Sequence, residues 1–263
     1  MVCAVIEIEK AFKNIKYYDD THTYFDTNTG KKLISVTQTL GKIKETFDEE
    51  KWLKIKSKER NITVEELKKE WWLASKIGTT RGVILHKYME DLFSRKVYPK
   101  TYGNLENVLS IVPLIEYIKS VDSIKEMGDK FIEDHPNLIP IKSEVVIGSS
   151  EIGIAGMFDQ LMYDELKDSY SIIDYKTDKE IKFTNKWSSL KDPLNHLDDC
   201  QFNKYSLQLS LYKYIIEKYT NIKISELKII WFNHKNDSYK IFEVDFLKDD
   251  IEKLIKYITN DNK

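Results

Sequence analysis

The sequence predicts a mixed α/β protein, with a central mixed β-sheet flanked by helices and an N-terminal extension of strands and helices. Two observations predict this class. Apolar residues recur at helical spacing through much of the first half of the chain, and the pattern becomes strand-like from about residue 142. In addition, 263 residues with 41% hydrophobic and 32% charged side chains suit a soluble globular protein with one large domain.

The first part of the chain is expected to form short strands followed by helices. Residues 5–36 favour strands, with a turn at residues 28–30, Asn-Thr-Gly. Residues 37–76 favour helices. Within them, Thr63 and Glu66 have the spacing of a capping box, which predicts that a helix begins there.

A glycine and two threonines at residues 78–80 predict an interruption of this helical region. The next helix is expected over residues 81–95, where apolar side chains recur at helical spacing. Another is expected over residues 104–127, bent or interrupted near Pro113, because a proline removes a backbone hydrogen bond inside a helix.

The second half of the chain is expected to supply most of the sheet. Three consecutive strands are separated by turn-forming residues, and a helix and a further pair of strands follow. The expected elements are strands over residues 142–147, 152–162 and 171–177, a helix over 199–219, strands near 226–233 and 239–245, and a helix over 248–258.

The composition argues against several functional classes. The formal net charge is −2, which argues against a protein that coats nucleic acid by bulk charge but is compatible with a local basic groove. Cys3 and Cys200 are the only cysteines, which excludes a disulfide framework, a four-cysteine zinc site and a four-cysteine iron–sulfur cluster. The first apolar run ends at Glu7 and no run reaches the length of a membrane span, so we expect an intracellular protein without a membrane partner.

Two acidic residues lie near the ends of two neighbouring expected strands. With a turn over residues 163–170, a symmetric hairpin pairs residue 162 with residue 171 and Asp159 with Asp174, with Cβ atoms about 5 Å apart. Like charges placed opposite each other are destabilising, and a divalent cation such as Mg²⁺ or Mn²⁺ would offset the repulsion. Lys176 shares a strand face with Asp174 and would act on a phosphate or an attacking water. Glu144, one strand earlier, would supply another carboxylate, directly or through water.

An Asp-x-Lys sequence by itself more often marks a solvated strand edge with an ion pair. Here the context differs, because Asp174 follows the apolar pair Ile172-Ile173 and Asp159 follows the largely apolar residues 154–158. An unpaired carboxylate is costly in a buried strand. The two acids and the lysine together therefore favour a metal site.

Five short motifs follow one another along the chain, namely Gly82-x-x-x-His86, Glu144, Gly156-x-x-Asp159, Asp174-Tyr175-Lys176-Thr177 and Gln208-x-x-x-Tyr212. Together, over about residues 78–212, they resemble the PD-(D/E)xK nucleases, and more closely the RecB-like branch. The chain has Asp-Tyr-Lys where Glu-x-Lys is common, a variation that this branch allows. The opening segment from Tyr24 to Thr37 is similar to the start of phage and mitochondrial single-strand exonucleases of the branch, and this match is the weaker one.

The resemblance implies a central sheet of the restriction-endonuclease-like type in a single nuclease domain over residues 1–263. Within it, residues 1–77 would form a DNA-contacting extension and residues 78–263 the catalytic core. Members of the branch that carry an iron–sulfur cluster use four cysteines, so this chain would carry none. One or two Mg²⁺ or Mn²⁺ ions are the implied cofactors.

The metal ligands follow from the matched motifs. Asp159 and Asp174 would bind the metal, with the carbonyl of Tyr175 as a further ligand. His86 would bind a second metal or complete the ligands of the first. A lone histidine on an apolar helix is more often a satisfied core residue, but its place in the motif favours the metal.

The other matched residues would act on the water and the DNA. Lys176 would position or activate the attacking water, with a pKa lowered by the nearby cation. Glu144 would support the metal or the water. Gln208 and Tyr212 are four residues apart, and so on one helix face, and would line the pocket near the DNA strand or Lys176.

The implied activity is metal-dependent hydrolysis of phosphodiester bonds by a DNA exonuclease that acts on single strands or DNA ends, in recombination, repair or genome processing. The alternatives are a structure-specific endonuclease, a catalytically silent nuclease-like protein that binds nucleic acid or a protein, and a sugar-phosphate or nucleotide hydrolase. No helicase motif occurs, so a helicase or recombination protein would be a separate partner. The Lys-, Ile- and Asn-rich composition is typical of an AT-rich genome, such as that of a phage or virus.

A local excess of basic residues is expected to contact the DNA. Residues 42–100 contain 15 Lys and Arg against 10 Asp and Glu, a charge of +5, and the rest of the chain has 26 against 33, a charge of −7. Basic side chains follow phosphates, and aromatic rings stack on unpaired bases. The alternative is a solvated helix face with its tryptophans in the core. The candidate DNA-contacting residues are Trp52, Lys54, Lys56, Lys58, Arg60, Lys182 and Lys186.

Overall fold

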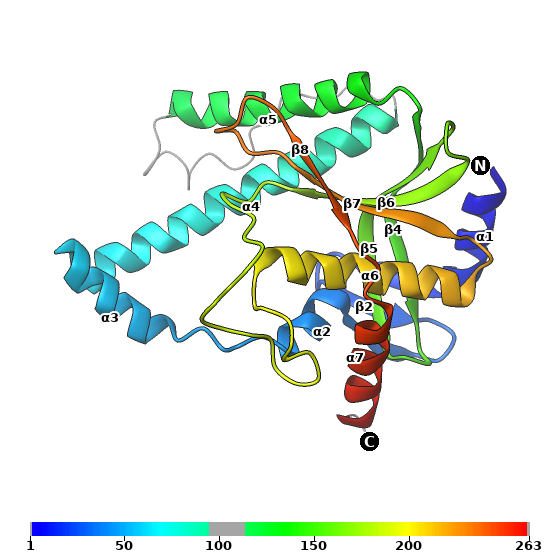
Figure 1. Ribbon diagram of the computed structural model, residues 1–263, viewed down its shortest axis with the longest axis horizontal. Coiled ribbons are helices and arrows are strands. Elements are labelled where there is room, and N and C mark those ends of the chain that lie inside the picture. The colour runs from blue at the N-terminus through cyan, green and yellow to red at the C-terminus, as the bar shows by residue number, and fades with distance from the viewer. Residues whose placement is uncertain (1, 95–113, 262–263) are drawn as a thin grey trace.

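The protein is built around one mixed β-sheet flanked by helices, as the sequence predicts (Figure 1). The structure is a computed structural model that describes residues 2–94 and 114–261. In chain order, the elements are α1 (Val2–Phe12), β1 (Ile15–Tyr18), β2 (Thr23–Asp26), β3 (Lys31–Ser35), α2 (Val36–Lys42), α3 (Glu49–Arg60), α4 (Val64–Phe93), α5 (Leu114–Asp134), β4 (Leu138–Ser149), β5 (Ile154–Asp164), β6 (Ser169–Lys176), α6 (Gln201–Tyr219), β7 (Ile224–Trp231), β8 (Lys240–Val244) and α7 (Lys248–Asp261).

Eight strands form the sheet in the order β1-β2-β3-β5-β6-β7-β8, and β4 pairs with β5 outside this path. The pairs β3–β5 and β6–β7 are parallel, and the other pairs are antiparallel. In the β5–β6 hairpin, Met162 pairs with Ser171. This is the register that the sequence predicts, because the turn between the strands and their apolar pattern both specify it.

The two faces of the sheet pack against different helices. Ile172 and Ile229 are fully buried in a cluster that includes the apolar face of α6. Ile173 and Ile230, the next residues along the same strands, lie instead in a cluster with Leu85 of α4 and residues of α5. Because neighbouring strand residues point to opposite faces, the sheet separates α6 from α4 and α5.

The N-terminal segment differs from the expectation. Residues 2–12 form the helix α1, and strands begin only at Ile15, so the prediction of strands from residue 5 is wrong for this part. Ala4, Ile8 and Phe12 are spaced by four residues and are all buried on one face of α1, which contacts β4. The expected turn at residues 28–30 is present between β2 and β3, where Gly30 has a φ of +66°.

The helix α4 is continuous over 30 residues, from Val64 to Phe93. The expected capping box is present at its start, where Thr63 and Glu66 bond to each other's backbone N–H groups. The predicted break at residues 78–80 is wrong. Thr79 is accommodated because its hydroxyl donates to the carbonyl of Ser75 at 3.0 Å. The expected division of the chain at residues 77 and 78 lies inside this helix.

The remaining helices agree with the expectation to within a few residues, with one exception. The helix expected over residues 104–127 lies partly outside the described residues, and α5 runs from Leu114 to Asp134. Figure 1 shows α3 and the first half of α4 projecting away from the sheet, while the second half of α4 lies beside α5. Of the helices in the described ranges, none is long and apolar enough to cross a membrane.

Candidate active site

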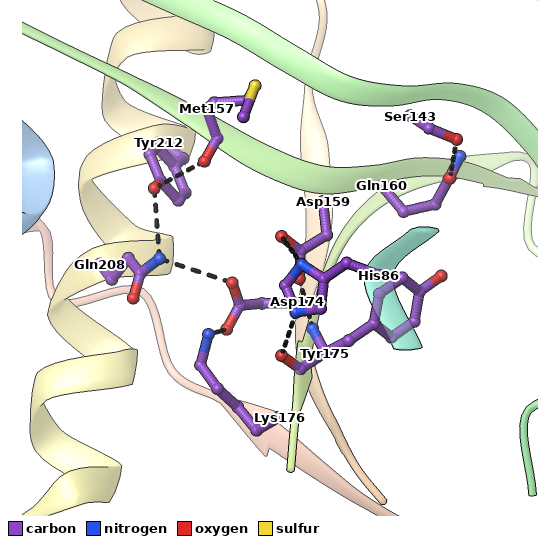
Figure 2. Close-up of polar contacts among 10 residues, drawn as sticks. All are labelled: His86, Ser143, Met157, Asp159, Gln160, Asp174, Tyr175, Lys176, Gln208 and Tyr212. Atoms are coloured by element: carbon purple, nitrogen blue, oxygen red, sulfur yellow. Dashed lines mark hydrogen bonds and ion pairs between the residues drawn. The ribbon is translucent and has the colours of Figure 1, made fainter. Parts of the chain in front are cut away.

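The candidate site lies where the sheet is interrupted along one edge of β5. On this edge, β6 pairs with residues 160–164 of β5, and β3 pairs with residues 154 and 155. Residues 156–159 lie between the two partner strands. Their backbone groups need other partners, and the Met157 carbonyl accepts a hydrogen bond from the hydroxyl of Tyr212 at 2.9 Å. The gap brings side chains of α4 and α6 to the same stretch of strand (Figure 2).

Asp159 occupies the end of this gap and connects β5 to β6. Its Oδ2 accepts a hydrogen bond from the backbone N–H of Tyr175 at 2.6 Å. Its Oδ1 lies 3.4 Å from Nδ1 of His86 on α4, and the other ring nitrogen of His86 lies 3.1 Å from the Tyr175 carbonyl oxygen. His86 therefore bridges the side chain of one strand and the main chain of the next.

Glu144 approaches the same place from β4. It lies between Ser143, which pairs with Gln160, and Val145, which pairs with Phe158, and its φ is +48°. Glutamate rarely adopts this left-handed conformation, so the surrounding ladder must hold it there. Burial raises the pKa of Glu144 to about 7, and the negative charge of Asp159 raises this pKa as well.

Asp174 and Lys176 point to the α6 side of β6. They form a buried ion pair, with Asp174 only 1% exposed. The amide of Gln208 donates to Asp174 at 3.5 Å and to the hydroxyl of Tyr212 at 3.2 Å. Tyr212 is buried, and its hydroxyl donates to the Met157 carbonyl. It therefore holds the side chain of Gln208 in place (Figure 2).

The two aspartates lie just beyond the end of the β5–β6 ladder. The recorded ladder of the hairpin ends at Gln160 and Ile173, one position before them. The reason is local, because the Asp159 side chain accepts the Tyr175 N–H. Asp159 contacts His86 on α4, whereas Asp174 contacts Gln208 on α6.

Lys176 and Asp174 influence each other's pKa values. Burial alone would lower the pKa of Lys176, but the charges of Asp174 and Asp159 outweigh it, so that the pKa is raised and the ammonium stays protonated. The lowered pKa expected from the sequence depends on a nearby cation, and these side chains by themselves act in the opposite direction. Burial raises the pKa of Asp174 to about 6, although the Lys176 charge opposes this rise.

Tyr205 is a site residue that the sequence analysis missed. The Nζ of Lys176 lies 4.7 Å from the centroid of its ring, which is within the range of a cation–π contact. The Tyr205 hydroxyl donates to Asp178 at 2.9 Å, which fixes the ring. Tyr205 lies three residues before Gln208 on α6. Because residues three apart share a helix face, this spacing could have identified Tyr205 as a site residue from the sequence.

The donor set fits a hard divalent cation. One ligand atom from each of His86, Glu144 and Asp159 lies within 4.8 Å of the others. The Tyr175 carbonyl oxygen lies beside this group, 3.1 Å from Nε2 of His86, and would be a further oxygen ligand. Burial and the charge of Asp159 both raise the pKa of Glu144, and a bound cation would oppose both effects. Asp174 lies outside this group of three and would join it by leaving Lys176.

The structure brings together seven of the predicted residues and Tyr175, and it places the predicted DNA-contacting residues elsewhere. Lys54 and Lys58 lie on α3, where Lys56 pairs with Glu59 and Arg60 with Glu70. The indole of Trp52 is 40% exposed. The contact of Arg60 with Glu70 lies 16 residues before His86, which is about 24 Å along the axis of α4. Lys182 and Lys186 are exposed in the segment between β6 and α6.

Comparison with known proteins gives only weak structural likenesses. No family model and no curated protein matches the sequence. Among solved structures, a protein of Eubacterium rectale designated an exonuclease is 14% identical with a TM-score of 0.39, over 68% of this chain and 65% of that one. An alkaline exonuclease of Laribacter hongkongensis is 13% identical with a TM-score of 0.33, over 73% of this chain and 91% of that one. The chain thus spans less than two thirds of the Eubacterium protein.

Proposed function

We propose that this protein is a metal-dependent DNA nuclease that hydrolyses phosphodiester bonds, of the PD-(D/E)xK superfamily and its RecB-like branch. One observation carries the proposal. A group of possible metal ligands, His86, Glu144 and Asp159, lies at the gap in the sheet beside the buried Asp174–Lys176 pair. These carboxylates repel one another unless a cation is bound, and the adjacent ammonium is suited to an anionic substrate.

The residues would divide the work as follows. His86, Asp159, Asp174 and the Tyr175 carbonyl would hold one or two Mg²⁺ or Mn²⁺ ions, with Glu144 supporting the metal or its water. The chemistry that such an ion supplies is activation of water and neutralisation of charge on the scissile phosphate.

Lys176 would donate hydrogen bonds to the phosphate or to the attacking water. The charges of Asp174 and Asp159 raise its pKa and favour the ammonium form, which stabilises negative charge. Gln208 holds the Asp174 carboxylate, and Tyr212 holds Gln208. Tyr205 limits the positions of the Lys176 side chain.

Within this class, we propose an exonuclease that acts on single strands or DNA ends in recombination, repair or genome processing. The exposed cations and Trp52 on α3 would contact the strand away from the reacting groups. Helix α3 is connected to His86 by the single helix α4. A DNA strand bound on α3 would therefore have a fixed position relative to the site.

The deciding experiment is release of labelled nucleotides from linear and circular single-stranded DNA with Mg²⁺, Mn²⁺ or EDTA. Wild type is compared with Asp174→Ala and with Asp249→Ala, an exposed aspartate on α7 that serves as the matched control. We expect metal-dependent loss of the linear strand alone, abolished by Asp174→Ala and unchanged by Asp249→Ala.

Each of the other outcomes would indicate a different function or refute the site. Cleavage of circles would indicate an endonuclease. DNA binding without cleavage under any condition would indicate a catalytically silent nuclease-like protein. Equal cleavage by wild type and Asp174→Ala would refute the proposed site.

A further inference from the structure

A cavity of about 780 Å³ opens beside the end of β6, outside the group of residues described above. It lies between α4, α5 and the segments that follow β6 and β7. Five charged side chains line it, and three of them are cationic: Arg81, Lys179 and Lys235. The acidic ones are Glu116 and Asp178, so the lining carries a net charge of +1 from three cations and two acids.

Arg81 is the half-buried member of the cationic lining. Its Nη1 donates to Nδ1 of His234 at 2.7 Å, and its Nε is buried without a hydrogen-bond partner. Burial lowers the pKa of Arg81, and Tyr117, which also lines the cavity, acts in the opposite direction. A guanidinium has five N–H donors and is costly to bury without a counter-charge.

No ion pair is recorded between Arg81 and either acidic residue of the cavity, among the described part of the chain. The Oδ2 of Asp178 accepts the hydrogen bond of the Tyr205 hydroxyl at 2.9 Å. Glu116 is exposed in the first turn of α5. His234 is held neutral, because burial and the charge of Arg81 lower its pKa to about 4. The cavity therefore presents a guanidinium that donates hydrogen bonds to an uncharged ring.

The cavity adjoins the reacting groups on two elements. Thr177, which lines it, directly follows Lys176. Its hydroxyl reaches α4, where a Cβ on Gly82 would lie 3.5 Å from it. On α4, Arg81 precedes His86 by five residues, about 7.5 Å along the helix axis. A strand whose scissile phosphate lies at His86 and Lys176 would therefore have a neighbouring phosphate within reach of Arg81.

We propose that this cavity binds a phosphate group of the substrate strand, with Arg81 as its main ligand and Lys235 at its rim. The planar fork of an arginine matches two phosphate oxygens, and a phosphate would supply the counter-charge that the guanidinium lacks. His234 orients the fork by accepting from Nη1. The inference rests on the proposed function, since it takes the ligand to be a DNA strand. The phosphate is either terminal or internal, and the chemistry of recognition is the same.

The test is binding of internally labelled single-stranded oligonucleotides in EDTA, followed by fluorescence anisotropy over a range of salt concentrations. The strands carry a 5′-phosphate, a 3′-phosphate or no terminal phosphate, and a circle is included. Wild type is compared with Arg81→Gln, with Lys235→Gln, and with Lys256→Gln on α7 as the matched control. Circular dichroism establishes that each variant is folded.

We expect Arg81→Gln to weaken binding roughly tenfold. It should also reduce the slope of log K against log salt by about 0.7, the value for one phosphate contact on a single strand. Lys235→Gln should change both quantities in the same direction by less, and Lys256→Gln should change neither. Losses confined to one phosphorylated end would identify a terminal phosphate, and equal losses on every strand, circle included, an internal one.

Several results would overturn the inference. If Arg81→Gln is folded and binds every strand as wild type does, Arg81 is structural. If Arg81→Gln does not fold, Lys235→Gln decides the question. An unchanged slope of log K against log salt in that variant would also refute the phosphate site. Wild type that binds no DNA also refutes the phosphate site. By contrast, binding that depends on Arg81 without cleavage in Mg²⁺ or Mn²⁺ would refute the nuclease function and leave the phosphate site standing.

Discussion

Gly156 is the point at which helices α2 and α6 both meet strand β5. A Cβ at this position would lie 2.7 Å from Cε1 of Tyr212 and 2.8 Å from Cγ2 of Val36, where ordinary contacts begin at 3.4 Å. Both side chains would have to retreat. Val36 is β-branched and therefore stiff, and Tyr212 is held by its bonds to Met157 and Gln208.

The substitution Gly156→Ala should therefore affect both stability and activity. Inserting a methyl group into a well-packed core costs about 1–3 kcal/mol of unfolding free energy. With an m-value of about 3 kcal/mol per M, the midpoint of urea unfolding falls by about 0.3–1 M. Displacement of Tyr212 also moves Gln208, and a shift of about 1 Å in positioning groups costs up to about a hundredfold in rate.

The assay is urea unfolding followed by circular dichroism, together with kcat and KM on linear DNA. The control is Gly41→Ala, an exposed helical glycine with no atom within 4 Å of the added Cβ, which should stabilise slightly because alanine favours helix. An unchanged midpoint in Gly156→Ala would show that Val36 and Tyr212 can move away from the added methyl group without loss of stability. A lower midpoint with full kcat would show that Tyr212 does not act through Gln208.

Three further changes test other contacts of the site. Lys176→Met leaves Asp174 buried without its partner, and urea unfolding should show a loss of about 3 kcal/mol at pH 8. Tyr205→Leu removes the ring beside Lys176 and should lower kcat about fivefold, whereas Tyr205→Phe keeps the ring and should retain most of the rate. His234 has a folded pKa of about 4, below the ordinary value of about 6.5, so the unfolded chain binds the proton first as pH falls. Stability should therefore fall between pH 6.5 and 4, by about 1 kcal/mol after allowance for solvent screening, and urea unfolding of His234→Gln should show a flatter pH dependence.

Local patterns predicted the β5–β6 hairpin because all its determinants lie within a short stretch of chain. The register of β5 and β6 follows from the turn and the apolar pattern, and the pair Met162–Ser171 confirms it. The relation between Asp159 and Asp174 could not be predicted in the same way. It depends on a side chain replacing a backbone partner at the end of the ladder, which no spacing rule describes.

The errors in the helices have different physical causes. The start of the chain was interpreted as strand because its first apolar residues are largely β-branched, but the buried Ala4, Ile8 and Phe12 show a helical spacing that was available in the sequence. At residues 78–80, local propensity predicts a break, whereas burial of Ile77 and Ile84 on one face of α4 keeps the helix continuous. Tertiary packing overrides propensity in this case.

Contacts between distant segments could not be predicted from the sequence. Arg81 and His234 are 153 positions apart, and neither lies in a motif that points to the other. Only the fold, which places the end of β7 beside α4, brings the two side chains to one cavity.

The placement of β3 has a consequence for synthesis of the chain. Ser35 pairs with Ala155, which is 120 positions later, so β3 has no partner on this side until that part of β5 has been made. At about 5–20 residues per second, the nascent strand waits about 6–24 s with an open edge. Lys31 and Lys32 are exposed on β3, and lysines on an open edge discourage pairing with other chains. These two lysines thus protect the nascent chain from aggregation during this interval.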